Sequence, residues 1–98
     1  MEIEIKRNDI QLVVRVNGEL NTLTAPEFEK QVFPELNGIN DLVLDFEKLD
    51  YISSAGLRVL LVSKKVMDKQ GEMVVRHPNN EVMEIFEITG FKDILTIE

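Results

Sequence analysis

Two adjacent serines, Ser53 and Ser54, precede Ala55 and Gly56 at the predicted start of the longest helix. A serine hydroxyl at a helix N-terminus can accept a hydrogen bond from a free backbone amide, which stabilises the helix by about 0.5–2 kcal/mol. The same free amides and the helix dipole also favour an anion at this position. Helix capping is therefore the simpler explanation of these serines. A serine that receives a phosphate is a second interpretation, compatible with the first.

A hydrolase would need a base and a tight turn around its nucleophilic serine. The only histidine is His77, and Ile52 stands where a nucleophile elbow has glycine, two residues before Ser54. We therefore rank a hydrolase that uses Ser54 and His77 last among the functions considered. We expect that the protein is not an enzyme.

Residues that bind metals or cofactors are scarce. The chain has no cysteine and one histidine, so it has neither a thiolate site nor a pair of histidine ligands. Both common glycine-rich nucleotide loops are absent. Glu81, Glu84 and Glu87 are neighbours on a predicted helix, but a solvated helix face is a more frequent explanation than a metal site. We expect no cofactor and no metal.

Length and charge limit the classes of partner. The chain has 98 residues, the size of one domain, so we interpret residues 1–98 as a single domain. Its 11 basic and 18 acidic residues give a net charge of -7, which opposes binding to nucleic acid phosphates. No apolar run approaches the roughly 20 residues of a membrane-spanning helix. We expect a monomer that binds another protein, with neither nucleic acid nor membrane as partner.

Short β-prone segments are spread along the whole chain. The first two alternate apolar and polar residues around a turn at Asn8-Asp9, which predicts a hairpin. The next is a short apolar run typical of a strand buried on both faces. The expected strands are residues 2–6, 11–16 (ended by Asn17-Gly18), 41–46, 72–76 and 94–97.

The first predicted helix follows the second strand. Thr24 and Glu27 have the spacing of a capping box, in which each side chain bonds to the backbone amide of the other residue. Pro26 lies in the first turn, where its missing amide hydrogen costs little. Pro34 should end or kink this helix near Phe33.

Two more helices follow further along the chain. The longer is predicted over residues 54–69, and the other over residues 81–89, with an asparagine cap before it and Gly90 after it. Helical spacing places four apolar residues of the last helix on its inward face: Val82, Ile85, Phe86 and Ile88.

The resulting order, β-β-α-β-α-β-α-β, predicts an α/β fold with a mixed sheet and helices packed on it. Binding sites in such folds lie where the carboxyl ends of strands lead into helices. Residues 21–24, 53–56 and 79–80 occupy such positions. Residues 21–24 and 53–58 should be neighbours and form a contact surface. Leu23 is either an apolar anchor for a partner or a hydrophobic staple of the first helix.

The segment LDYISSAGLRVLL at residues 49–61 resembles the signature of the STAS domain, specifically the stand-alone bacterial anti-sigma factor antagonists. Four further segments resemble other parts of that family in the same order. They are GELNTLTA at 18–25, LVLDF at 42–46, GEMVV at 71–75 and ITGF at 88–91. The resemblance covers nearly the whole chain.

The resemblance implies a single STAS-type domain that regulates transcription by partner switching. The unphosphorylated family member binds an anti-sigma factor that is also a serine kinase, and so releases the sigma factor. Phosphorylation of one serine ends the interaction, and a serine phosphatase restores it. That serine lies two residues before the glycine of the signature, which is Ser54 here. Ser53 and Asn21 stand where the family commonly has aspartate.

We therefore expect a cytoplasmic phosphoprotein, since the first residues resemble neither a signal peptide nor a lipidation site. Ser54 is the expected phosphorylation site, whereas Ser53 should be mainly structural and bond the first-turn amides. The alternative is a STAS module without phosphorylation, which binds a small anionic or nucleotide ligand or acts as a scaffold. The expected partner contacts are Asn21, Thr22, Leu23, Thr24, Ser53, Ala55, Gly56, Leu57 and Arg58.

Overall fold

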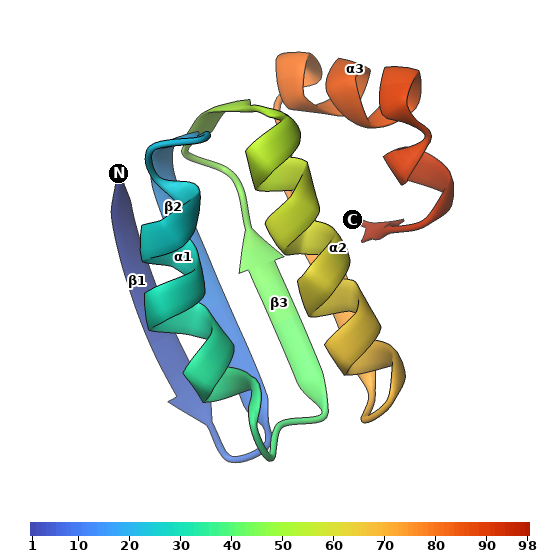
Figure 1. Cartoon of the computed structure of the whole chain (residues 1–98). Helices are drawn as coiled ribbons and strands as arrows, with labels where there is room; N and C mark the ends of the chain where they lie inside the picture. The colour runs from blue at the N-terminus through green and yellow to red at the C-terminus, as the bar shows by residue number, and fades with distance from the viewer.

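The computed structural model describes residues 1–98 and begins with a hairpin of two long strands (Figure 1). Strand β1 (Glu2–Asn8) pairs antiparallel with β2 (Gln11–Leu20), from Glu2 opposite Asn17 to Asn8 opposite Gln11. Asp9 has a φ of 58° in the turn, a conformation that asparagine and aspartate adopt more readily than other non-glycine residues. The predicted hairpin is confirmed.

The remaining strands extend this hairpin into a mixed sheet. Strands β3 (Asp41–Asp45), β5 (Glu72–Arg76) and β6 (Thr96–Ile97) follow β2 in the order β1-β2-β3-β5-β6, and all pairings after the hairpin are parallel. Parallel strands need crossover connections, which the helices provide here. The predicted α/β class with a mixed sheet is confirmed, although the last strand is shorter than expected.

One additional strand, β4 (Leu49–Ile52), lies in a segment for which the sequence analysis predicted no strand. The prediction that β2 ends at Asn17-Gly18 is also wrong, because β2 continues to Leu20 and pairs there in parallel with β4. The register shifts between Gly18 and Glu19, and Gly18 has a φ of 109°, which only glycine adopts readily. The bulge lets a single strand pair with β3 along one part and with β4 along another.

Helices α1 (Ala25–Val32) and α2 (Ser54–Asp68) cover one face of the sheet (Figure 1). Strand β2 buries Leu12, Val14 and Val16 beneath them, while Arg15 is exposed on the opposite face. Pro34 ends α1 as predicted, and the chain continues as the 3-10 helix η1 (Phe33–Leu36). The face opposite α1 and α2 is only partly open to solvent, because Val43 of β3 is buried on it, as predicted for a strand buried on both faces.

Helix α3 (Asn80–Thr89) packs against β4 and is followed by the short 3-10 helix η2 (Phe91–Asp93). The predicted asparagine cap is confirmed, since the Asn79 side chain accepts a hydrogen bond from the Val82 amide at 2.7 Å. The prediction that Ile88 faces inward is wrong, because its side chain is 76% exposed. Val82 and Phe86 form a narrow buried face, and Ile88 projects away from it.

Candidate functional site

The carboxyl ends of β2 and β4 lie side by side at one end of the sheet. Leu20 pairs with Ile52, and the backbone amide of Ser53 donates to the Leu20 carbonyl at 2.9 Å. Residues 21–24 and 53–54 continue from these paired ends, and α1 and α2 begin at the same end of the molecule (Figure 1). The prediction that the two segments are neighbours is confirmed.

Side-chain hydrogen bonds fix the loop of residues 21–24. The Asn21 Oδ1 atom accepts from the amides of Leu23 at 3.0 Å and Thr24 at 3.1 Å. The Thr24 hydroxyl accepts from the Asn21 amide at 2.9 Å and donates to the Glu19 carbonyl at 2.8 Å. An aspartate could accept the same two amide bonds, so asparagine at this position keeps the loop geometry with one negative charge fewer.

The capping box predicted for Thr24 and Glu27 is wrong. Thr24 is the N-cap residue of α1, but its side chain makes no cap hydrogen bond. Its hydroxyl is already used by Asn21 and Glu19 inside the preceding loop. The bonds of Thr24 therefore stabilise the loop in place of the start of the helix.

Leu23 lies in this loop with 87% of its side chain exposed. A hydrophobic staple would require Leu23 to pack against the first helix, so that alternative is wrong. The neighbouring bonds of Asn21 and Thr24 restrict the backbone on both sides of Leu23. The loop thus presents an apolar side chain to solvent in a defined position.

The two serines have different environments. Ser54 is the first residue of α2 and is exposed, so its hydroxyl is accessible to another protein. Ser53 is the N-cap residue with extended backbone, and its Oγ atom is buried without a hydrogen-bond partner. The expectation that the Ser53 hydroxyl bonds the first-turn amides is therefore wrong. The first turn is closed by the backbone, where the Leu57 amide donates to the Ser53 carbonyl at 2.9 Å.

Gly56 is buried where α2 crosses the ends of β2 and β4. A Cβ atom there would lie 2.6 Å from the Leu20 carbonyl oxygen and 2.6 Å from Cγ1 of Ile52. The glycine is therefore required by the close approach of the helix to the strands. Leu57 is also buried, so neither residue offers side-chain surface to a partner. Both residues hold the first turn of α2 against the strands and add nothing to its exposed surface.

The exposed part of the site is consequently smaller than the sequence analysis expected. We use the term rim for its solvent-facing residues, which are Thr22, Leu23, Ser54 and Arg58. The third candidate loop, at residues 79–80, has a structural role. Its Asn79 side chain caps α3 and donates to the Leu49 carbonyl at 3.0 Å.

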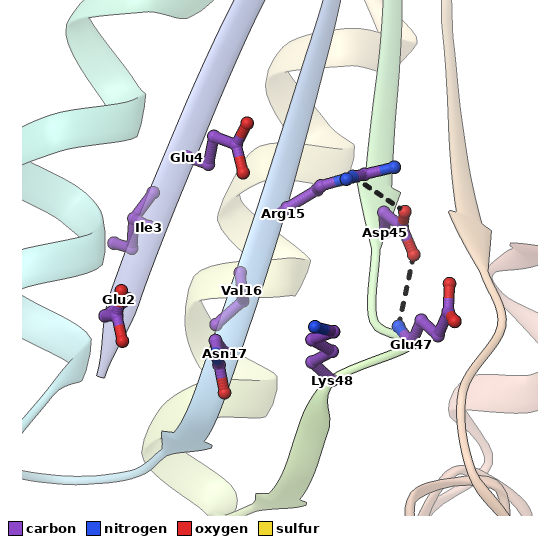
Figure 2. Close-up of a pocket in the computed structure, with 9 residues that line it drawn as sticks. All are labelled: Glu2, Ile3, Glu4, Arg15, Val16, Asn17, Asp45, Glu47 and Lys48. Atoms are coloured by element: carbon purple, nitrogen blue, oxygen red, sulfur yellow. Dashed lines mark hydrogen bonds and ion pairs between the residues drawn. The ribbon is translucent and has the colours of Figure 1, made fainter.

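A hollow of about 400 Å³ lies on the open face of the sheet (Figure 2). Arg15 pairs with Asp45 at 3.2 Å, and Asp45 also accepts a bond from the Glu47 amide at 3.1 Å. Four carboxylates and two cations line the hollow, so its charge opposes an anionic or nucleotide ligand. No local pattern in the sequence predicts this hollow, because three separate segments contribute to it. The lining residues are Glu2, Ile3, Glu4, Arg15, Val16, Asn17, Asp45, Glu47 and Lys48.

The other candidate groups do not combine into a reactive site. His77 follows β5, and its backbone amide donates to the Glu98 carbonyl at 3.2 Å, but no hydrogen bond joins it to Ser54. Glu81, Glu84 and Glu87 are exposed on α3, and no group of three or more His, Asp or Glu side chains is placed to hold a metal ion. No helix has the length and apolar character needed to cross a membrane.

Comparison with known proteins gives consistent matches along the chain. The family model described as the STAS domain matches residues 2–98. The chain is 38% identical over 99 residues to BtrV of Bordetella bronchiseptica, which is provisionally named an anti-sigma factor antagonist. The alignment covers 99% of this chain and 85% of BtrV. It is 28% identical over 98 residues to the anti-sigma-B factor antagonist of Bacillus subtilis, with 99% and 90% covered.

Solved structures match equally well. The crystal structure of TM1081 from Thermotoga maritima, also provisionally named an anti-sigma factor antagonist, matches with a TM-score of 0.89 and 28% identity, over 97% of this chain and 84% of that chain. Phosphorylated SpoIIAA of Bacillus matches with a TM-score of 0.76 and 15% identity, over 99% and 91%. At that identity the SpoIIAA match concerns the fold alone.

We predict that Gly56→Ala lowers the free energy of unfolding by about 1–3 kcal/mol, because the added methyl group must displace helix or strand backbone. Urea denaturation followed by circular dichroism measures this change. The control is Ser54→Ala, two residues earlier and exposed, which should change the free energy by less than about 0.5 kcal/mol. Equal stability of Gly56→Ala and wild type would contradict the packing role.

For Ser53→Ala we predict that stability is unchanged or increased, in contrast to the loss expected for Gly56→Ala. Ser53→Ala removes a buried hydroxyl that has no partner, and such a group costs about 1–3 kcal/mol. The melting temperature of the variant should therefore equal or exceed that of the wild type. A clear decrease in a thermal melt would show that the hydroxyl makes a stabilising bond.

Proposed function

Because the chain belongs to the STAS domain family, we propose that it is an anti-sigma factor antagonist whose contact surface is the rim. Its partner is an anti-sigma factor with serine kinase activity, and binding releases the sigma factor. Phosphorylation of Ser54 by that kinase ends the interaction, and a serine phosphatase reverses it. Since transcription is regulated in the cytoplasm of bacteria, this function places the protein there.

One observation carries the proposal: Ser54 is exposed at the start of α2, next to a fixed loop that exposes Leu23. A kinase needs an accessible hydroxyl, and a protein partner needs apolar surface beside it. The paired ends of β2 and β4 hold both features at one end of the sheet. The names of the relatives supply the class of partner.

The effect of a phosphate follows from its charge and position. It adds about -1.5 to -2 charges and three acceptor oxygens. At the start of α2 the free amides and the helix dipole favour this charge, so the fold should persist. Arg58 lies one turn further along α2, within the spacing at which side chains pair, and should bind the phosphate.

The complex is affected much more than the free protein. A phosphate on Ser54 must lose water when a partner packs over it, and the helix amides and Arg58 replace only part of that hydration, so enclosing the phosphate costs several kcal/mol. A loss of 1.4 kcal/mol already reduces affinity tenfold. Pairing with the phosphate would also withdraw Arg58 from the partner. Release therefore requires no global conformational change.

We predict that Ser54→Asp folds normally and binds the anti-sigma factor at least about tenfold more weakly than the wild type. Ser54→Ala should bind as tightly as the wild type and stay bound when ATP is added. Isothermal titration calorimetry with the purified kinase measures both affinities, and peptide mapping after reaction with ATP identifies the modified residue.

Two results would contradict this assignment. One is equal affinity of the kinase for phosphorylated and unmodified protein. The other is modification of Ser53 in place of Ser54. A protein that no serine kinase modifies but that still binds a partner would instead support the scaffold alternative.

We also predict that Leu23→Ser weakens binding about tenfold, because an exposed apolar anchor contributes on the order of 1–2 kcal/mol. Ile10 is a matched control, since it is 47% exposed in the turn between β1 and β2. Ile10→Ser should bind within about twofold of the wild type. Equal losses of affinity in the two variants would contradict the assignment of the rim to the interface.

A further inference from the structure

The outward side of α2 carries a stripe that begins at Ser54 and runs to the end of the helix. Successive spacings of four, four, three and four residues place its members on one face, opposite the buried Gly56, Leu60 and Met67. All are exposed, including Val62 at 38%. We call this stripe the α2 ridge, and its members beyond Ser54 are Arg58, Val62, Lys65 and Lys69.

The charge of the α2 ridge is opposite to that of the molecule. Residues 54–69 contain four basic residues and one acidic residue, a net charge of +3, whereas the whole chain carries -7. The acidic residue, Asp68, is paired with Lys64 on the side of the helix. Arg58, Lys65 and Lys69 have no ion-pair partner in the structure. The three free cations therefore concentrate positive potential on a single face.

Apolar surface accompanies these cations. Val62 lies between them and lines a hollow of about 370 Å³ together with Lys65, Val66, Lys69 and Gln70. The Gln70 side chain, at one end of the hollow, donates to the carbonyls of Leu36 at 2.6 Å and Ile39 at 2.7 Å. These bonds attach one side of the hollow to η1 and to the segment that follows it. An apolar side chain flanked by acidic residues would complement the apolar and basic residues that line the hollow.

Size is a further argument for a contact role. The rim consists of a loop and a single helical turn, whereas a stable protein interface buries about 800 Å² on each partner. The α2 ridge extends the rim by roughly 16 Å, from Arg58 to Lys69, at about 1.5 Å of rise per residue. It is continuous with the rim because Ser54 and Arg58 belong to both.

We infer that the α2 ridge is a second part of the partner interface and binds an acidic strip with an apolar residue on the anti-sigma factor. This inference rests on the proposed function. The rim supplies the residue that is switched, and the α2 ridge supplies charge complementarity, which speeds association and fixes the orientation of the partner.

The test uses the double variant Lys65→Gln/Lys69→Gln and the purified serine kinase that modifies Ser54. Lys6→Gln/Lys48→Gln is the matched control, because it changes the net charge equally and lies away from α2. Calorimetry at about 50 and about 300 mM salt measures the affinities, since exposed charges are screened more strongly at the higher concentration. Circular dichroism checks that every variant is folded.

We expect the ridge double variant to bind about tenfold more weakly than the wild type at low salt, and to lose less affinity when salt is raised. The control should remain within about twofold of the wild type. Val62→Ser should also weaken binding, with an unchanged salt dependence. These three results together support the inference.

Other outcomes overturn it in distinguishable ways. If the ridge double variant binds like the wild type while Ser54→Asp does not bind, the α2 ridge is outside the interface and the proposed function stands. Equal losses in ridge variant and control would indicate a general charge effect. A wild-type dimer that the ridge variant abolishes, seen by sedimentation, would assign the α2 ridge to a second copy of the chain. Failure of every serine kinase to bind the wild type would remove both proposals.

Discussion

The close approach of α2 to the ends of β2 and β4 is the constraint on which the site depends. Gly56 allows it, because any side chain there would collide with the Leu20 carbonyl. The same approach buries Leu57 and orients the first turn so that Ser54 faces solvent. The bond from Ser53 to Leu20 then places the loop containing Leu23 beside that turn. A packing requirement and the proposed contact surface thus share one short segment.

Local signals in the sequence predicted the elements well. Several of these signals act within a few residues, so they can be recognised in a single sequence. They are the turn at Asn8-Asp9, the proline that ends α1, and the Asn79 cap and Gly90 end of α3. The start of α2 at Ser54 was predicted for the same reason. The mutual position of the two site segments followed from a topological rule, since the carboxyl ends of parallel strands meet at the same edge.

Features that depend on distant residues could not be predicted from the sequence alone. Strand β4 has four residues and pairs with β2 about thirty residues away, so no local pattern marks it. The Thr24 hydroxyl could bond either to the first turn of the helix or to the preceding loop. The position of the Glu19 carbonyl, which the sequence alone does not show, selects the loop. Ile88 fits a helical stripe but lies beyond the narrow face that α3 buries. The basic stripe on α2 needs the helix orientation before its cations can be placed on one side.

The central claim is that the rim at the ends of β2 and β4 contacts a serine-kinase anti-sigma factor. Hydrogen exchange of the complex, read by mass spectrometry, tests it directly because it reports on the backbone without any substitution. The account predicts slowed exchange in residues 21–24 and 53–58 on binding. Slowed exchange confined to α3, with residues 21–24 and 53–58 unchanged, would contradict it.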